Sequence, residues 1–378
     1  MVDYEILRVL WWALLGTLLI GFAVMDGFDL GVAALLPIVG RTADERRVMI
    51  NTVGPVWEGN QVWLILGAGA IFAAWPALYA MAFSCFYLAM LLVLLALILR
   101  PVGFKFRGKI DDARWRRVWD TALVISGVVP ALVFGVAFGN VLEGVPFNYD
   151  ADLRLSYDGG LFSLLNPFAL LCGLVSLTML IAHGGSYLAL KTEGVIASRA
   201  ARATRIASLL MIVLFAVAGY WVATHLIGYQ LTSDFAHDGP SNPLHKSVTA
   251  TARAWIGNYQ RYPCMMLAPI TGFVGALGAA VFSGRMRIAS FLATALTCAG
   301  VILTAGFSLF PFLMPSSLNP DVSLTVWDSS SSATTLAVMA FVTAIFLPII
   351  LLYTAWVYRV LRGPVTQSAI VRDPHSYY

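Results

Sequence analysis

The sequence predicts an all-α polytopic membrane protein, and two observations carry that prediction. Of its 378 residues, 59% are hydrophobic and only 12% are charged, with a mean hydropathy of +0.80. The apolar residues occur in separate runs, several of them close to the roughly 20 residues that a membrane-spanning helix needs. The small net charge of +4 gives no reason to expect a nucleic acid partner.

Nine segments qualify as transmembrane helices within a single membrane domain, residues 1–378. They are roughly 9–36, 57–75, 78–99, 118–141, 162–184, 205–227, 263–283, 288–310 and 334–357. Only the dipeptide Trp75-Pro76 separates the second segment from the third, since proline breaks a helix. A chain with eight spans is therefore the competing interpretation.

The distribution of basic residues favours nine spans. Most of the 24 Lys and Arg then fall in loops on one side of the membrane. These loops lie near 41–47, 100–117, 185–205, 284–287 and 358–372. Because Lys and Arg concentrate in cytoplasmic loops, we predict an outer N-terminus and a cytoplasmic C-terminus. With eight spans, the 41–47 cluster would lie outside.

Three carboxylates lie on or just inside apolar runs. Asp26 and Asp29 are three residues apart and share a helix face. In the nine-span topology, Glu58 begins the second span and Arg100 ends the third on the same side, so we expect all four at one membrane level. An Asp in mid-membrane costs about 2.5–3.5 kcal/mol and usually faces protein or water. Two interpretations stay open: a chain of acids that takes in protons from the cytoplasm, or interfacial residues paired with arginines.

Other polar and aromatic residues near these acids have less specific patterns. Trp57 and Trp63 flank Glu58, and tryptophan favours the membrane interface, so a role as interfacial anchors is preferred. Asn60 and its neighbour Gln61 suggest a packed polar contact. No two of the five histidines are spaced for haem or metal, and the sequence contains no catalytic motif. His183, the one well within a span, is interpreted as a hydrogen-bonded interior residue.

Several longer motifs occur in one order along the chain. They are Asp26-Gly27-Phe28-Asp29, Trp57-Glu58-Gly59-Asn60-Gln61-Val62-Trp63, Arg100-Pro101-Val102-Gly103-Phe104 and Phe310-Pro311-Phe312-Leu313-Met314-Pro315-Ser316-Ser317. With these motifs the chain strongly resembles subunit II of the cytochrome bd ubiquinol oxidase family, essentially from end to end.

The resemblance implies two four-helix bundles plus a peripheral ninth helix, in the bacterial cytoplasmic (inner) membrane with a periplasmic N-terminus. It also implies a larger subunit I, which holds a low-spin haem b (haem b558), a high-spin haem b (haem b595) and haem d. A small single-helix accessory subunit often completes such a complex. The complex oxidises quinol, reduces oxygen to water in the respiratory chain and contributes to the proton gradient.

The same resemblance implies roles for individual residues. Glu58, Asp29 and Asp26 would belong to a hydrophilic proton pathway, and Trp63 would lie at the mouth of an oxygen path. Arg100 and Lys109 would support assembly of the haem site. His183 replaces the glutamine associated with its position. Some relatives hold a quinone in this subunit, but no binding site can be assigned from the sequence.

A function from a different class remains as the alternative. Acids within spans, glycines and a weak parallel between Asp26-Gly27 and His183-Gly184 would also suit a self-contained secondary transporter. Against it, the spans lack paired interruptions in corresponding places.

Overall fold

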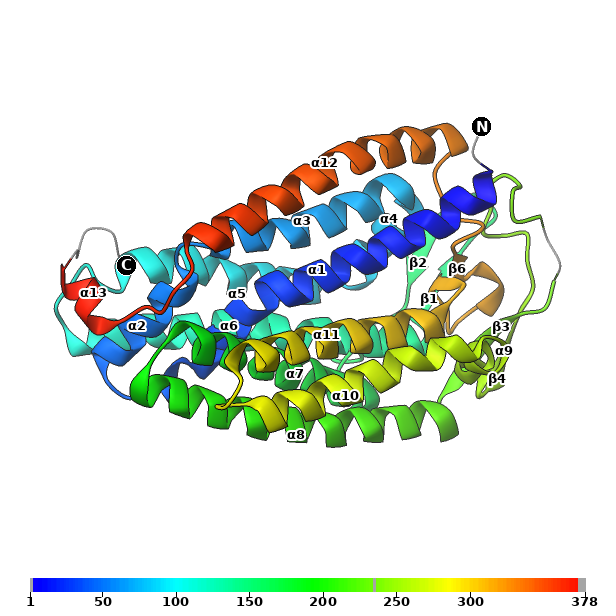
Figure 1. Ribbon diagram of the computed structural model, residues 1–378. Coiled ribbons are helices and arrows are strands. Elements are labelled where there is room, and N and C mark those ends of the chain that lie inside the picture. The colour runs from blue at the N-terminus through cyan, green and yellow to red at the C-terminus, as the bar shows by residue number, and fades with distance from the viewer. Residues whose placement is uncertain (1–2, 234–235, 373–378) are drawn as a thin grey trace.

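The computed structural model describes residues 3–233 and 236–372, apart from the side chains of residues 369 and 371, and shows an elongated helical bundle (Figure 1). The helices are α1 Tyr4–Val39, α2 Ala43–Val53, α3 Trp57–Ala74, α4 Pro76–Cys85, α5 Tyr87–Phe106, α6 Ala113–Glu143, α7 Pro167–Lys191, α8 Gly194–Thr224, α9 Gly257–Arg261, α10 Leu267–Phe282, α11 Arg287–Leu309, α12 Ala333–Val360 and α13 Gln367–Arg372. Three short antiparallel pairs join β1 Phe147–Tyr149 to β2 Leu155–Tyr157, β3 Ile227–Leu231 to β4 Val248–Ala252, and β5 Phe312–Met314 to β6 Leu324–Thr325.

The all-α polytopic class is confirmed. Within the described part of the chain, 8 helices are long and apolar enough to cross a membrane: α1, α5, α6, α7, α8, α10 with the turn before it, α11 and α12. The predicted span at 57–75 is α3, which has 18 residues and stands outside these eight because its first turns are polar. The count of nine transmembrane helices therefore stays a prediction.

The Trp75-Pro76 break divides the chain where the sequence indicates. Pro76 opens α4, a position where the missing N–H of proline removes no helical hydrogen bond. The predicted span at 78–99 is consequently two helices, α4 and α5. Helix α8 begins at Gly194 instead of near 205, so Arg199 lies in a helix and not in a loop. Its early turns are helical because Ala197, Ala200 and Ala201 bury a small-residue face.

The helices pack in two groups. One contains α1, α3, α5 and α6, and the other contains α7, α8, α10 and α11; α6 and α1 both pack against α7, and α1 also touches α11. Helix α12 lies along the outside, against α3 and α1, with Leu336 as its only buried residue (Figure 1). This arrangement agrees with two four-helix bundles and a peripheral helix.

Figure 1 also distinguishes two ends of the bundle. One end carries α2 and α13 and is called the α2 end; the other carries the strands and α9 and is called the strand end. The basic loops that the sequence places in the cytoplasm lie at the α2 end.

Two glycines bring α1 and α7 into backbone contact. A Cβ on Gly184 would lie 2.5 Å from the carbonyl carbon of Gly31, and one on Gly31 would lie 2.0 Å from the Leu180 carbonyl oxygen. Small residues at a helix crossing allow such an approach in membrane proteins. The close approach of α1 to α7 therefore requires glycine at both positions.

Gly184→Ala is expected to destabilise the protein by about 1–3 kcal/mol, because the new methyl group meets backbone that must move. Gly16→Ala on α1 is the matched control, since nothing lies within 4 Å of a Cβ there. Thermal unfolding of the purified protein measures the difference, and equal melting temperatures for the two variants would contradict the interpretation.

Candidate functional site

A buried ion pair lies in the interior of the first bundle. Arg100 on α5 donates from Nη1 to Oδ1 of Asp26 on α1 at 2.6 Å. Both side chains are buried, with relative side-chain exposures of 1% and 0%. Removing one member of such a pair leaves an uncompensated charge in a medium that solvates it poorly. The pair therefore fixes α5 against α1.

Asp29 extends this cluster one turn along α1. Asn60 on α3 donates from Nδ2 to Asp29 Oδ2 at 2.9 Å, and Tyr358 on α12 donates its hydroxyl to Asn60 Oδ1 at 2.7 Å. The packed polar contact expected at Asn60 is confirmed. Tyr358 was not predicted, because a tyrosine at the end of an apolar helix resembles an ordinary interfacial residue.

Several buried polar atoms of this cluster make no hydrogen bond to the described part of the chain. Among the described residues, no hydrogen-bond partner exists for Asp26 Oδ2, Asp29 Oδ1, Arg100 Nε or Arg100 Nη2. Buried polar atoms of this kind are costly unless something pairs with them. The cluster holds one guanidinium and two carboxyl groups, so its net charge depends on how many protons the carboxyls hold.

Glu58 does not join the cluster. Its side chain is exposed, although Asn60, two residues later on α3, is buried against Asp29. Residues two apart on an α-helix lie about 200° apart around its axis, so they point to nearly opposite sides. Asp26, Asp29 and Arg100 lie at one level, and Glu58, two residues from Asn60, lies near that level with its side chain facing outward.

The two tryptophans of α3 are interior residues and not interfacial anchors. Trp57 and Trp63 are each 6% exposed. Trp63 packs on α1 where a Cβ at Gly21 would lie 2.4 Å from its ring, and Trp57 stacks edge-on against Phe104 at 5.7 Å between ring centroids. The interpretation as anchors is wrong because Trp63 fills the room that Gly21 leaves on α1 and Trp57 packs against Phe104 on α5.

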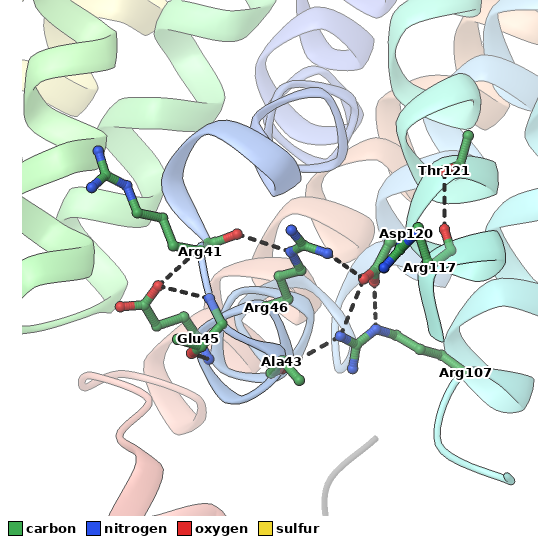
Figure 2. Close-up of polar contacts among 10 residues, drawn as sticks. Arg41, Ala43, Glu45, Arg46, Arg107, Arg117, Asp120 and Thr121 are labelled. Carbon is green, nitrogen blue, oxygen red and sulfur yellow. Dashed lines mark hydrogen bonds and ion pairs between the residues drawn. The ribbon is translucent and has the colours of Figure 1, made fainter. Parts of the chain in front are cut away.

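A second ionic cluster, at the α2 end, joins α2, α5 and α6. Asp120 on α6 accepts from Arg107 Nε at 2.5 Å and from Arg46 Nη1 at 2.8 Å, so α2, α5 and α6 meet at one carboxylate (Figure 2). This carboxylate balances the charge of the two arginines that it binds. Lys109 is exposed in the loop that follows Arg107.

Glu45 makes the other polar contacts in this region. It accepts hydrogen bonds from the backbone N–H groups of Arg41 and Thr42 and pairs with Arg199 at 2.9 Å. Partial burial acts to raise the pKa of Glu45, but these hydrogen bonds and the Arg199 guanidinium outweigh it, so the pKa lies below its usual value. The carboxylate therefore stays ionised and holds α2 to α8.

His183 is committed to protein contacts. It is fully buried, its Nε2 lies 2.9 Å from the Val24 carbonyl oxygen, and its Nδ1 lies 2.8 Å from Thr294 Oγ1. A carbonyl only accepts, so Nε2 carries a proton and is unsuited to bind iron. The ring also stacks on Phe291, with 4.9 Å between centroids. The interpretation of His183 as a hydrogen-bonded interior residue agrees with these contacts.

The other described histidines contact polar or aromatic neighbours of the chain. His225 contacts Thr224 Oγ1, His237 stacks on Trp327 and His245 contacts Asn242, all near the strand end. His375 lies outside the described residues. Within the described residues, no group of three or more His, Cys, Asp or Glu could hold a metal ion.

Fold and site together define a class: an all-α, multi-pass membrane protein that keeps two carboxyls and an arginine inside a helix bundle. Residues 7–361 match the family of cytochrome bd terminal oxidase subunit II. The chain belongs to that family, which confirms the resemblance seen in its motifs. It is a subunit of a bd-type quinol oxidase, an oxidoreductase complex with haem cofactors and a subunit I.

Individual relatives agree with this assignment over their whole length. The chain is 50% identical over 380 residues to cytochrome bd-I ubiquinol oxidase subunit 2 of Escherichia coli K12, covering 100% of both. It is 49% identical over 379 residues to a probable cytochrome oxidase subunit 2 of Haemophilus influenzae, again covering 100% of both. With cytochrome bd ubiquinol oxidase subunit 2 of Bacillus subtilis it shares 34% over 376 residues, which is 98% of this chain and 99% of the relative.

A solved structure supports the fold independently. A chain of the bd oxidase from Geobacillus thermodenitrificans superimposes with a TM-score of 0.64 at 16% identity. The match covers 94% of this chain and 98% of that one. At such low identity the likeness shows the fold alone.

Proposed function

We propose that this chain is the haem-free partner subunit of a ubiquinol:oxygen oxidoreductase and that it supplies a proton pathway. Subunit I holds haem b558, haem b595 and haem d, oxidises the quinol and reduces oxygen to water. A small single-helix accessory subunit belongs to the same complex, and the lipid bilayer surrounds it. The N-terminus lies in the periplasm and the C-terminus in the cytoplasm, so the α2 end faces the cytoplasm.

The buried cluster of Asp26, Asp29 and Arg100 is the observation that carries this proposal. Asp29 lies ten residues from the end of α1, about 15 Å along the helix axis from the α2 end. Carboxyls at that depth can accept and release protons, while Arg100 offsets the charge of one of them. The unpaired oxygens of Asp26 and Asp29 offer sites where a proton can be held.

Glu58 extends the same pathway at the surface of the chain. A carboxylate that faced lipid at this depth would cost several kcal/mol, so we propose that subunit I covers it in the complex. Protons then pass from the cytoplasm between the subunits and along the acids toward the haems. Protons released from quinol leave on the opposite side, and the two events together contribute to the proton gradient.

The other predicted residues take supporting roles. Arg100 and Lys109 help the haem site to assemble, Arg100 by holding α5 against α1 and Lys109 from the exposed loop at the α2 end. Trp63 borders an apolar oxygen path beside α1. Membership of this family favours the oxidase over the self-contained transporter, and co-purification of a haem-containing larger chain would test that choice.

Glu58→Gln is expected to lower quinol-driven oxygen consumption by about tenfold or more, since an amide cannot relay a proton. The visible haem spectrum of the complex should not change. Glu193→Gln is the matched control, because Glu193 is also exposed and lies in the short loop between α7 and α8. Unchanged oxygen consumption in Glu58→Gln would remove Glu58 from the pathway.

A further inference from the structure

Helix α12 makes one side-chain hydrogen bond toward the buried acids, besides the contact in which Trp11 Nε1 donates to the Leu336 carbonyl at 3.0 Å. Nearly all of its side chains lie on the outside of the bundle, and Tyr358 in its last turns is half-buried. The Tyr358 hydroxyl donates to Asn60 Oδ1, and Asn60, only 2% exposed, donates to Asp29. A peripheral helix is thus joined to a buried acid through a single amide.

The chemistry of an amide makes this chain of contacts directional. An ionised carboxylate only accepts hydrogen bonds, so Asn60 must turn its Nδ2 toward Asp29 and its Oδ1 away. The buried Oδ1 then needs a donor, and the Tyr358 hydroxyl supplies it.

A protonated Asp29 permits the opposite arrangement. Its hydroxyl can donate to Asn60 Oδ1, and the reversed amide can donate from Nδ2 to the Tyr358 oxygen. A tyrosine hydroxyl serves both arrangements because it donates and accepts, whereas phenylalanine serves neither.

The neighbouring ionisable side chains Arg100 and Tyr187 make their hydrogen bonds to groups other than Asn60. Arg100 on α5 pairs with Asp26 on α1. Tyr187 on α7 donates to the Thr52 carbonyl at 2.9 Å. In the structure Tyr358 is therefore the hydroxyl that supports Asn60.

We propose that Tyr358 is a positioning residue for Asp29, acting through Asn60, and that the Asn60 amide reverses as Asp29 gains and loses its proton. The inference rests on the proposed role of Asp29 in proton uptake. It gives the peripheral helix α12 a role in the catalytic turnover of the complex, because Tyr358 lies on that helix.

Tyr358→Phe in the intact complex should lower kcat for quinol-driven oxygen consumption by about tenfold, the effect of one lost hydrogen bond to a buried group. KM for quinol and the haem spectrum should stay unchanged, because no substrate contact is removed. Tyr353→Phe is the matched control: it is the same substitution on the same helix, at a side chain that is 64% exposed.

A double-mutant cycle with Asn60→Ala tests the route of the effect. If Tyr358 acts through Asn60, adding Tyr358→Phe to Asn60→Ala should lower kcat no further. Additive losses would overturn the inference, as would a wild-type kcat, a raised KM or lost haem absorbance in Tyr358→Phe.

Asp29→Asn separates this inference from the proposed function. If Asp29→Asn is inactive and Tyr358→Phe turns over normally, the positioning role fails and the pathway stands. If Asp29→Asn is fully active, the pathway through Asp29 fails, and the inference fails with it.

Discussion

Asp29→Asn should lower quinol-driven oxygen consumption by about a hundredfold, the scale on which a positioned proton-transfer group contributes to a rate. The amide has the shape of the acid and can still accept the hydrogen bond from Asn60, which the structure places at 2.9 Å. It cannot take up and release a proton. An oxygen electrode with quinol as the donor measures the loss.

The haem spectrum and the melting temperature of this variant should stay close to those of the unmodified complex, which would separate a kinetic defect from misfolding. Asp152→Asn is the matched control, since Asp152 is exposed in the turn between β1 and β2 at the strand end. If both variants consume oxygen at the unmodified rate, protons reach the haems by a route that avoids Asp29.

Arg100→Met should destabilise the protein by about 3–5 kcal/mol, because it leaves the buried Asp26 carboxylate without its cation. Methionine fills much of the same volume, so the loss is of charge more than of packing. The melting temperature and the yield of haem-loaded complex measure the effect. Lys105→Met is the control, as Lys105 is an exposed cation near the end of the same helix.

A second substitution tests the physical cause of that effect. Adding Asp26→Leu to Arg100→Met removes the stranded carboxylate, and replacing a buried ion pair by apolar residues is often nearly neutral. The double variant should therefore be more stable than Arg100→Met alone. A single variant with unchanged stability, or a double variant that is worse, would show that the ion pair does not hold α5 against α1.

Much of the site follows from local periodicity. Asp26 and Asp29 share a helix face because they are three residues apart, and the structure buries both on α1. The nine-span topology placed Arg100 at their level, where it pairs with Asp26. The same reasoning placed Glu58 near that level but did not show that its side chain is exposed, since the presence of an acid in a helical turn does not say which way that helix is rotated.

The apolar runs, the basic loops and the family motifs are properties of the sequence alone, and they determined the all-α membrane class and the family of this protein. The tertiary structure decided which side chains meet. Tyr358 and Asn60 are 298 residues apart, and no local pattern relates them. Their contact depends on how α12 and α3 are rotated and on how closely helices approach, as at Gly31 and Gly184, where the absence of side chains lets two backbones touch.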